Sequence, residues 1–234
     1  ALHDPFLLPG NEVDEVVVVL DRPTDEARTG AMEAYRFPNT TFVNLSGEPG
    51  WKGPARAWNA GFRAATGDLL YCISSEVVQE PGNVSKAKAD AMDGHTVVFG
   101  ACHNSTSEQL VIGAEPGLLV SSKMPRPLGF IVCMPARKVR EIGGFDEAFM
   151  GGLWYDDDDF FLRLWRTGVT FAFDDAIHGT HLHHERPGLE TVEGHAAIAR
   201  NAALMIAKHG THHPWANLPK LVYGTSGRLT WKHL

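Results

Sequence analysis

Four consecutive carboxylates, Asp156 to Asp159, form the stretch of this chain with the clearest chemical potential. Like charges repel, so such a run is typical of a solvated loop or of the first turn of a helix, where the helix dipole favours negative charge. Here a Trp-Tyr pair precedes the run and a Phe-Phe pair follows it, which keeps the acids close to buried surface. Carboxylates beside aromatic groups at the start of a helix are candidates for a general base or a metal site. From these residues alone, a solvated cap and a chemically active site both remain open.

The residues after the run predict the element that positions it. We expect a short helix from Asp159 to Thr167 that is ended by Gly168. Its apolar face would consist of four side chains, Phe160, Phe161, Leu164 and Trp165.

A second cluster with chemical potential contains four histidines between residues 178 and 184. It follows a predicted strand, 169–173. Alternate residues of an extended segment project to one face, so His181 and His183 are expected to share a face and His184 to point away. Imidazole nitrogens are common metal ligands, and a polar His-rich loop is the alternative interpretation.

The rest of the chain predicts an α/β domain built on a mostly parallel sheet with helices on both faces. The run of β-branched residues from Glu15 to Leu20 is typical of a strand buried on both sides. Thr24 is expected to cap a helix that reaches about Tyr35. Further strands are predicted at 40–45, 69–73, 96–102 and 129–134, a hairpin near 110–112 and 118–120, and helices at 56–66, 85–92, 137–142 and within 188–210.

The order of motifs around the acidic run resembles the acceptor-side motif of family 2 glycosyltransferases with the GT-A fold. The shared pattern is Gly-Gly-Phe-Asp-Glu-x-Phe, a Gly-rich link, an acidic pair, and Asp-aromatic-x-x-Arg-x-x-x-x-Gly. The Trp-x-Asp-Asp-Asp-Asp segment is also similar to a motif of animal galactosyltransferases. Counting back from Arg163, the resemblance implies that Asp157 is the catalytic base and that Asp156, where the family has Glu, contacts an acceptor hydroxyl. Trp154 would stack on an acceptor sugar.

The N-terminal half resembles the nucleotide-binding half of the same family. The segment that contains Asp21 and Arg22 is similar to Val-Val-Asp-Asp-Gly-Ser-Thr-Asp, and the segment around Asn59 is similar to Ala-Arg-Asn-x-Gly. The resemblance implies that Asp21 accepts a hydrogen bond from the base, with Arg22, Arg56 and Asn59 on the same wall. A capped strand-to-helix turn and ordinary helix–sheet packing are the alternatives.

The metal-binding motif of the family is reduced in this chain. Ser74-Ser75-Glu76 stands where the family has Asp-x-Asp, so only Glu76 is acidic. The resemblance implies a divalent ion, Mn2+ or Mg2+, on Glu76 and on the histidine cluster, with His181 as the best positional match and His183 beside it. A site with one carboxylate, a metal-free enzyme and an inactive relative all remain open.

The resemblance therefore implies transfer of a sugar from a UDP- or GDP-sugar to a hydroxyl of a glycan, protein or small molecule, by an inverting and metal-assisted reaction. The alternative is a non-catalytic nucleotide- or sugar-binding module with a degenerate site. A metal hydrolase is disfavoured because no paired ligand motif such as His-Glu-x-x-His occurs.

Length and composition set further bounds. The 234 residues suit one domain, which we place at 1–210, followed by a C-terminal extension at 211–234. The family's first strand has no counterpart, and residues 1–12 are expected to be the remnant of its first helix. A net charge of -7 disfavours nucleic acid as a partner, and no apolar run approaches the ~20 residues of a membrane span. Three cysteines in apolar surroundings predict buried thiols and a cytoplasmic location.

Overall fold

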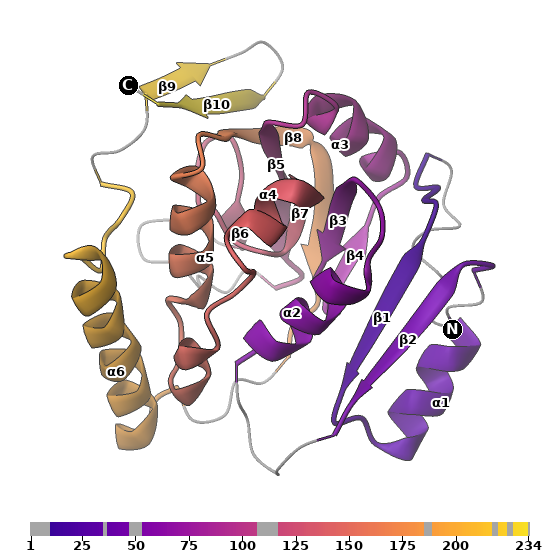
Figure 1. Cartoon of the computed structure of the whole chain (residues 1–234), viewed down its shortest axis with the longest axis horizontal. Coiled ribbons are helices and arrows are strands. Elements are labelled where there is room, and N and C mark those ends of the chain that lie inside the picture. Colours follow the sequence, from indigo (N-terminus) through magenta and orange to yellow (C-terminus); the bar gives the residue numbers. More distant parts are fainter. Residues whose placement is uncertain are drawn as a thin grey trace.

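The computed structural model describes residues 10–34, 37–46, 53–106, 117–184, 189–216, 220–223 and 227–233. Its strands form two sheets (Figure 1). The smaller sheet pairs β1 (Val16–Asp21) with β2 (Thr40–Leu45) in parallel. The larger sheet has eight strands, in the order β3 (Leu69–Ile73), β7 (Ile131–Pro135), β5 (Thr96–Asn104), β8 (Thr170–His181), β10 (Arg228–Lys232) and β9 (Lys220–Tyr223), with β4 (Val77–Gln79) on β8 and β6 (Leu118–Val120) on β5.

The expectation of a mostly parallel sheet was wrong, because the sheet is mixed. Among the described strands only β1–β2 and β5–β8 pair in parallel, and the other pairs are antiparallel. The apolar runs of β5 and β7 reflect burial rather than direction, since all residues of β7 and nearly all of β5 are buried. A strand covered on both faces is uniformly apolar whichever way its neighbours run.

The described helices lie around these sheets. They are α1 (Asp25–Ala34), α2 (Ala55–Ala64), α3 (Asn83–Ala91), α4 (Ala136–Glu141), the 3-10 turn η1 (Glu147–Gly151), α5 (Asp156–Trp165) and α6 (Val192–His209). Figure 1 shows α1, β1 and β2 on one side of the molecule and α5 and α6 on the opposite side. The predicted cap of α1 is confirmed, because the Thr24 hydroxyl accepts a hydrogen bond from the amide of Ala27 at 3.1 Å. None of the helices in the described ranges is long and apolar enough to cross a membrane.

Helix α5 begins at Asp156, three residues before the predicted start at Asp159. The preceding residue, Tyr155, has a left-handed backbone (φ 67°) and so cannot extend the helix backwards. All four carboxylates therefore lie in the first turn, where the amides of the helix end favour negative charge.

Strand β8 extends eight residues beyond its predicted end at Phe173 and reaches His181. Its register against β5 shifts between Gly100 and Ala101, where the partner changes from Asp174 to His178. This irregularity carries the strand past polar residues that read as a loop in the sequence. His178 and His181 consequently lie on a strand.

The C-terminal residues contribute to the main sheet in this structure. Strand β10 pairs with β8, and its residues Leu229 and Trp231 are buried. Strand β10, which the sequence assigned to a C-terminal extension, thus packs into the core of the main sheet. The expected helix remnant falls largely in 1–9, and the first strand of the expected hairpin in 107–116. Both lie outside the described residues.

Candidate active site

The four carboxylates at the start of α5 have different surroundings. Asp159 is fully buried, and its carboxylate contacts Arg163 Nε at 2.7 Å, Lys208 Nζ at 2.6 Å and His209 Nε2 at 2.8 Å. Burial opposes its ionisation, but these hydrogen bonds and charges prevail and lower the pKa of Asp159. Lys208 also pairs with Asp146. Asp159 therefore fastens α6 to α5.

Asp158 is held by the segment that follows α6. Its Oδ1 accepts a hydrogen bond from Trp215 Nε1 at 2.8 Å. Burial raises the pKa of Asp158, against the opposing effects of this bond and of the charges of Arg126 and His213. The indole of Trp215 is thus its hydrogen-bond partner, and two basic side chains lie close enough to act on its charge.

Asp157 faces the loop before β7. Its Oδ2 lies 3.4 Å from the amide nitrogen of Gly129. Burial and the neighbouring charge of Asp156 raise the pKa of Asp157 well above the ordinary range, while the Gly129 amide and the positive charge of Arg126 act in the opposite direction. A partly desolvated carboxylate of this kind binds a proton more readily than one in water.

Asp156 opens the helix next to the exposed side chain of Trp154. Burial raises the pKa of Asp156, with the charges of Asp158 and Asp159 adding to the effect and backbone amides opposing it. Trp154 is 56% exposed and is itself in the left-handed region (φ 62°). Among the described residues, no other side chain forms a hydrogen bond or an ion pair with Asp156 or Asp157, and the contact of Asp157 is with the backbone amide of Gly129. Asp158 and Asp159 are both bonded to other side chains.

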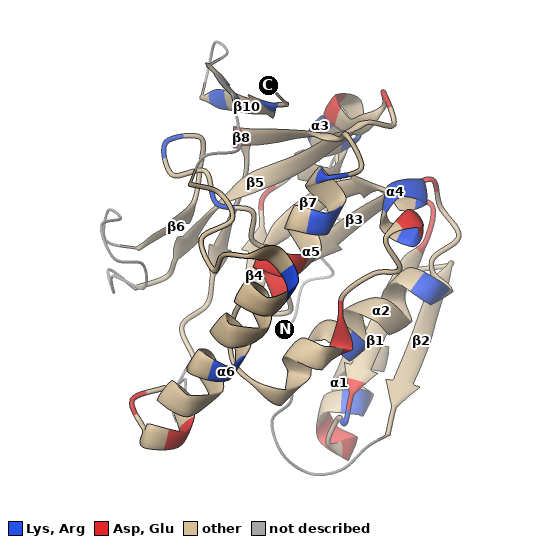
Figure 2. Cartoon of the chain, turned by 60° about the vertical axis from the view of Figure 1, so that its left-hand side comes forward, with Lys and Arg blue, Asp and Glu red and all other residues tan. Residues whose placement is uncertain are grey.

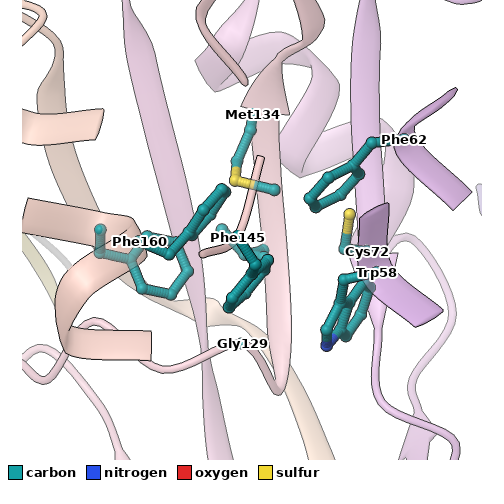
Figure 3. A pocket seen from close by; sticks show the side chains of 9 residues that line it. Trp58, Phe62, Cys72, Gly129, Met134, Phe145 and Phe160 are labelled. Carbon is teal, nitrogen blue, oxygen red and sulfur yellow. The ribbon is translucent and has the colours of Figure 1, made fainter. Parts of the chain in front are cut away.

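An apolar wall lies beneath this edge. A small apolar pocket of about 10 Å³ has Gly129, whose amide faces Asp157, among its lining residues. Figure 3 shows the aromatic rings and Met134 that surround it. Phe145 and Phe160 stack with ring centroids 4.1 Å apart, and Phe62 packs on both of them. A cavity this small and apolar leaves little room for solvent near the base of the carboxylates, which is consistent with the desolvation of Asp157.

Three of the predicted nucleotide-binding residues gather at the carboxyl ends of β1 and β2. Arg22 Nε and Nη2 each lie 3.1 Å from a carboxylate oxygen of Asp21, a two-point ion pair. Arg56 Nη2 donates to the carbonyl of Ser46 at 2.9 Å. An open pocket of about 340 Å³ lies here, lined by Arg22, Pro23, Arg28, Asn44, Leu45 and Ser46.

Asn59 has a different placement from the one implied by the resemblance. Its Nδ2 donates to the carbonyl of Phe145 and to Glu147 Oε1, each at 3.0 Å, and its Oδ1 accepts from the amide of Phe145 at 2.8 Å. The side chain is buried and fastens α2 to the Gly-Gly-Phe-Asp-Glu turn. We therefore assign it a structural role, the packing alternative that the sequence left open.

The histidine cluster is arranged differently from the alternating pattern. His181 is 3% exposed and lies opposite Val77 of β4 in the antiparallel pairing of β4 with β8. The centroid of its ring lies 5.3 Å from that of the His184 ring. Glu76 precedes β4, and its pKa is lowered by hydrogen bonds from Ser74 and Ser75 and by the charge of His184, which outweigh burial.

His183, which was expected beside His181, is exposed, and its amide donates to Ser105 Oγ. The alternation fails because β8 ends at His181, so the two-residue period does not continue past it. Within the described ranges no group of three or more His, Cys, Asp or Glu side chains is placed to hold a metal ion.

Asn104 orients the His181 ring. Asn104 Oδ1 lies 3.1 Å from His181 Nδ1, and Asn104 Nδ2 donates to Thr106 Oγ1. Because the amide oxygen only accepts, Nδ1 is the donor in this hydrogen bond. In a neutral ring, Nε2 is then the nitrogen that can bind a metal or accept a hydrogen bond.

Several side chains around the predicted site residues were not singled out from the sequence. Arg126, Trp215 and Asn104 come from segments without a recognisable motif, and only the folded chain brings them close to the predicted residues. His184 lies in the predicted histidine cluster, but it was expected to point away from His181, and its ring lies near that of His181 instead. Lys and Arg residues are scattered over several elements in Figure 2 rather than gathered on one face.

Comparisons with known proteins bear on this arrangement. A family model described as "Glycosyl transferase family 2" matches residues 7–126, which is 120 of the 234 residues and therefore more than half of the chain. The match contains the pocket at β1 and β2 and ends before the acidic run. A comparison with curated proteins found no match.

Several solved structures share the fold. GalNAc-T7 with UDP, GalNAc and Mn2+ aligns with a TM-score of 0.56 at 12% identity, over 81% of this chain and 41% of that one. S. aureus TarS 1-349 in complex with UDP-GlcNAc aligns with a TM-score of 0.58 at 15% identity, over 82% of this chain and 57% of that one. The mannosyltransferase PcManGT from Pyrobaculum calidifontis, in complex with GDP-Man and Mn2+, aligns with a TM-score of 0.52 at 16% identity, over 86% of this chain and 57% of that one.

This chain spans between 41% and 57% of the length of these three proteins. At such low identities, the likeness establishes the architecture, a GT-A type α/β fold. Together with the match of the family model over more than half of the residues, it shows that the chain belongs to glycosyl transferase family 2.

Proposed function

We propose that this protein transfers a sugar from a nucleotide-sugar to an acceptor hydroxyl, with Asp157 as the general base. The observation that carries the proposal is the division of the acidic run. Asp158 and Asp159 are tied to Trp215 and to the α5–α6 ion-pair network, which leaves Asp156 and Asp157 for an incoming substrate. These two are the residues that the family resemblance selects.

The reaction follows from the protonation properties of Asp157. The acceptor oxygen attacks the anomeric carbon, its proton passes to the Asp157 carboxylate, and the bond to the diphosphate breaks to release a nucleoside diphosphate. A base whose pKa lies nearer to neutrality shares the proton more effectively in the transition state than an ordinary carboxylate does. Attack from the side opposite the leaving group inverts the anomeric centre.

The residues around Asp157 would orient the acceptor. Asp156 can accept a hydrogen bond from a neighbouring hydroxyl, and the exposed Trp154 ring offers a stacking surface for a sugar. Glycans, glycosylated proteins and small hydroxylated molecules all share this chemistry.

The donor would bind at the pocket at the ends of β1 and β2. Asp21 can accept from a base N–H, while Arg22 and Arg56 supply positive charge for the diphosphate. The TarS and PcManGT structures contain UDP-GlcNAc and GDP-Man, so UDP- and GDP-sugars are the donors to test first.

A divalent ion, Mn2+ or Mg2+, would be held by Glu76 and by His181 or His184. A carboxylate and an imidazole whose Nδ1 is already engaged with Asn104 fit an ion that takes further ligands from the substrate diphosphate. When bound, the ion would offset the charge of the departing diphosphate. GalNAc-T7 and PcManGT were each solved with Mn2+.

A second candidate function is a nucleotide- or sugar-binding module without turnover. It is favoured by the single carboxylate of the Ser74-Ser75-Glu76 segment, where two acids would hold an ion more firmly.

The two candidates differ in whether nucleoside diphosphate is released. We expect the protein with Mn2+ and a suitable acceptor to release it from a UDP- or GDP-sugar, and Asp157→Asn to abolish most of this release while binding the nucleoside diphosphate normally. Binding without release from any donor, with or without Mn2+, would support the module and contradict the transferase.

The roles of Asp21 and Arg22 can be tested separately, because Asp21 is expected to contact the base and Arg22 the diphosphate. Asp21→Ala is expected to weaken nucleoside diphosphate binding by ~1–3 kcal/mol, the usual cost of a lost buried partner, but not pyrophosphate binding. Arg22→Ala should weaken both, and Glu33→Ala on the exposed face of α1 should weaken neither. Equal nucleoside diphosphate affinity in Asp21→Ala and the parent, measured by calorimetry, would remove Asp21 from the site.

A further inference from the structure

The segment that presents Trp154 has an unusual backbone. Trp154 and Tyr155 are consecutive non-glycine residues with positive φ, 62° and 67°. Each such residue is disfavoured by the contact between its Cβ and the backbone, and persists only where its surroundings hold it. The two residues stand directly before the acidic run, so their conformation sets where α5 begins and where the Trp154 ring is placed.

Helix α6 supplies the hydrogen bonds that hold this segment. Asn201, 1% exposed, donates from Nδ2 to the carbonyls of Phe149 and Trp154, each at 2.9 Å. The amide of Leu153 donates to the carbonyl of Ala197 at 3.2 Å. One buried amide therefore ties together both ends of the stretch from Phe149 to Trp154.

Helix α6 lies so close to Gly151 and Gly152 that larger side chains would not fit at these two positions. A Cβ at Gly152 would overlap Asn201 Oδ1 and the carbonyl oxygen of Ala197, and a Cβ at Gly151 would meet the Arg200 guanidinium. Arg200 itself donates to Asn201 Oδ1 at 2.8 Å and to the carbonyl of Ala148 at 3.2 Å. The Asn201 amide is thus oriented by its own neighbour, with both of its donors directed at the segment.

We propose that Asn201 is a positioning residue, which holds the left-handed Trp154–Tyr155 pair and thereby fixes the acceptor-binding surface relative to Asp156 and Asp157. The inference rests on the proposed function for its catalytic consequence, but its structural part stands independently. Helix α6 is anchored near its C-terminal end, where Lys208 and His209 bond to Asp159 of α5. The residue touches no substrate in this account and acts through the backbone of Trp154.

The structural part can be tested without any substrate. The protein is labelled with 5-fluorotryptophan, and the fluorine resonance of Trp154 is identified by its loss in Trp154→Phe. In Asn201→Ala we expect this resonance to shift or broaden while that of the core residue Trp165 stays in place. Asn83→Ala is the matched control, because Asn83 is also fully buried and also bonds backbone groups, those of His178 on β8.

An unchanged Trp154 resonance in Asn201→Ala, or an equal change in Asn83→Ala, would overturn the proposal. If Asn201→Ala does not fold, Asn201→Ser is measured instead. Its hydroxyl can replace at most one of the two donated hydrogen bonds, so a shift of the same resonance relative to the parent is still expected.

The catalytic consequence is read from steady-state kinetics. Asn201→Ala is expected to raise KM for the acceptor on the order of tenfold, since small misplacements of binding groups are costly, with KM for the donor unchanged. A rise in both KM values, or in neither, would overturn the positioning role. Absence of transfer in the parent protein would instead contradict the proposed function, and the fluorine result would still stand.

Discussion

Adjacent identical side chains in the acidic run meet different surroundings because successive residues of a helix are rotated by about 100°. Asp159 turns into the ion-pair network with α6, Asp158 toward Trp215, and Asp157 toward Gly129 and Arg126. The pKa of Asp159 is lowered and that of Asp157 raised, so chemically identical groups differ in how readily they bind a proton. At the scale of residues, environment rather than residue type distinguishes the proposed base from its neighbours.

The raised pKa of Asp157 predicts the pH dependence of transfer. A base must be ionised, so kcat/KM should fall as the pH decreases through a value above the ordinary carboxyl range. The charge of Arg126 lowers this pKa, so Arg126→Ala should move the acidic limb to higher pH. Lys123→Ala, an exposed change in the same loop, should leave the limb in place. A shift to lower pH in Arg126→Ala would show that Asp157 does not control the limb.

At the scale of elements, ion pairs and hydrogen bonds join α6 to α5 and to the segment before it. Lys208 of α6 contacts both Asp159 and Asp146, and Asn201 bonds the segment between η1 and α5. The turn that precedes this segment is in turn fastened to α2 by Asn59. The acidic edge is thus supported from two sides by buried polar groups.

Removing one member of a buried ion-pair network leaves the others unpaired. Asp159→Asn is therefore expected to reduce the free energy of unfolding by ~3–5 kcal/mol at neutral pH, as measured by urea denaturation. The folded-state pKa of Asp159 is lowered, so its stabilising effect is present above the ordinary carboxyl range and is lost as the pH falls through the lowered value. The difference between parent and variant should accordingly shrink at acid pH, whereas a difference that does not depend on pH would argue against the network. Asp25→Asn, at an exposed position of α1, should not change stability measurably.

At the scale of the whole molecule, the C-terminal hairpin belongs to the core. Trp231 of β10 packs on Phe173 of β8 and on Trp215, with ring centroids 5.0 and 5.6 Å away. Arg228 pairs with Asp90 of α3 at 2.5 Å. The main sheet therefore extends from β3 at one edge to β10 and β9 at the other.

This packing predicts a large effect from a position far from the site. Trp231→Ala should cost ~3–5 kcal/mol of unfolding free energy in urea denaturation, as is usual for large buried rings. Trp231→Phe should cost much less, because Trp231 Nε1 is buried without a hydrogen-bond partner among the described residues. Val222→Ala on the exposed side of the same hairpin is the control. If Trp231→Ala were no more destabilising than Val222→Ala, the C-terminal segment would be an extension after all.

Local patterns predicted much of this architecture. Strands β2 and β3 have the predicted bounds, and the Thr24 cap is present as expected. Strand direction could not be predicted, because a uniformly buried strand looks the same in parallel and antiparallel pairs. The extension of β8 was missed because its polar residues are paired by an irregular register against β5 that leaves no periodic trace.

The candidate site could be predicted only where residues lie close in sequence. The acidic run and Asp21 were recognised from motifs, whereas Trp215, Arg126 and Asn201 reach the site through tertiary contacts. Asn59 is the opposite case, because its sequence position matches a family motif but its side chain bonds to other parts of the chain. Its amide group is hydrogen-bonded to Phe145 and Glu147.

The most direct test of the central claim compares Asp157→Asn with Asp158→Asn in the acceptor-dependent release of nucleoside diphosphate. Asp157→Asn should lower the rate by ~10²–10⁴-fold, the usual effect of losing a general base, with donor affinity unchanged. Asp158→Asn should retain nearly the parent rate, because the new amide oxygen can still accept the hydrogen bond of Trp215. A near-parental rate in Asp157→Asn, or an equal loss in both variants, would contradict the assignment of Asp157 as the base.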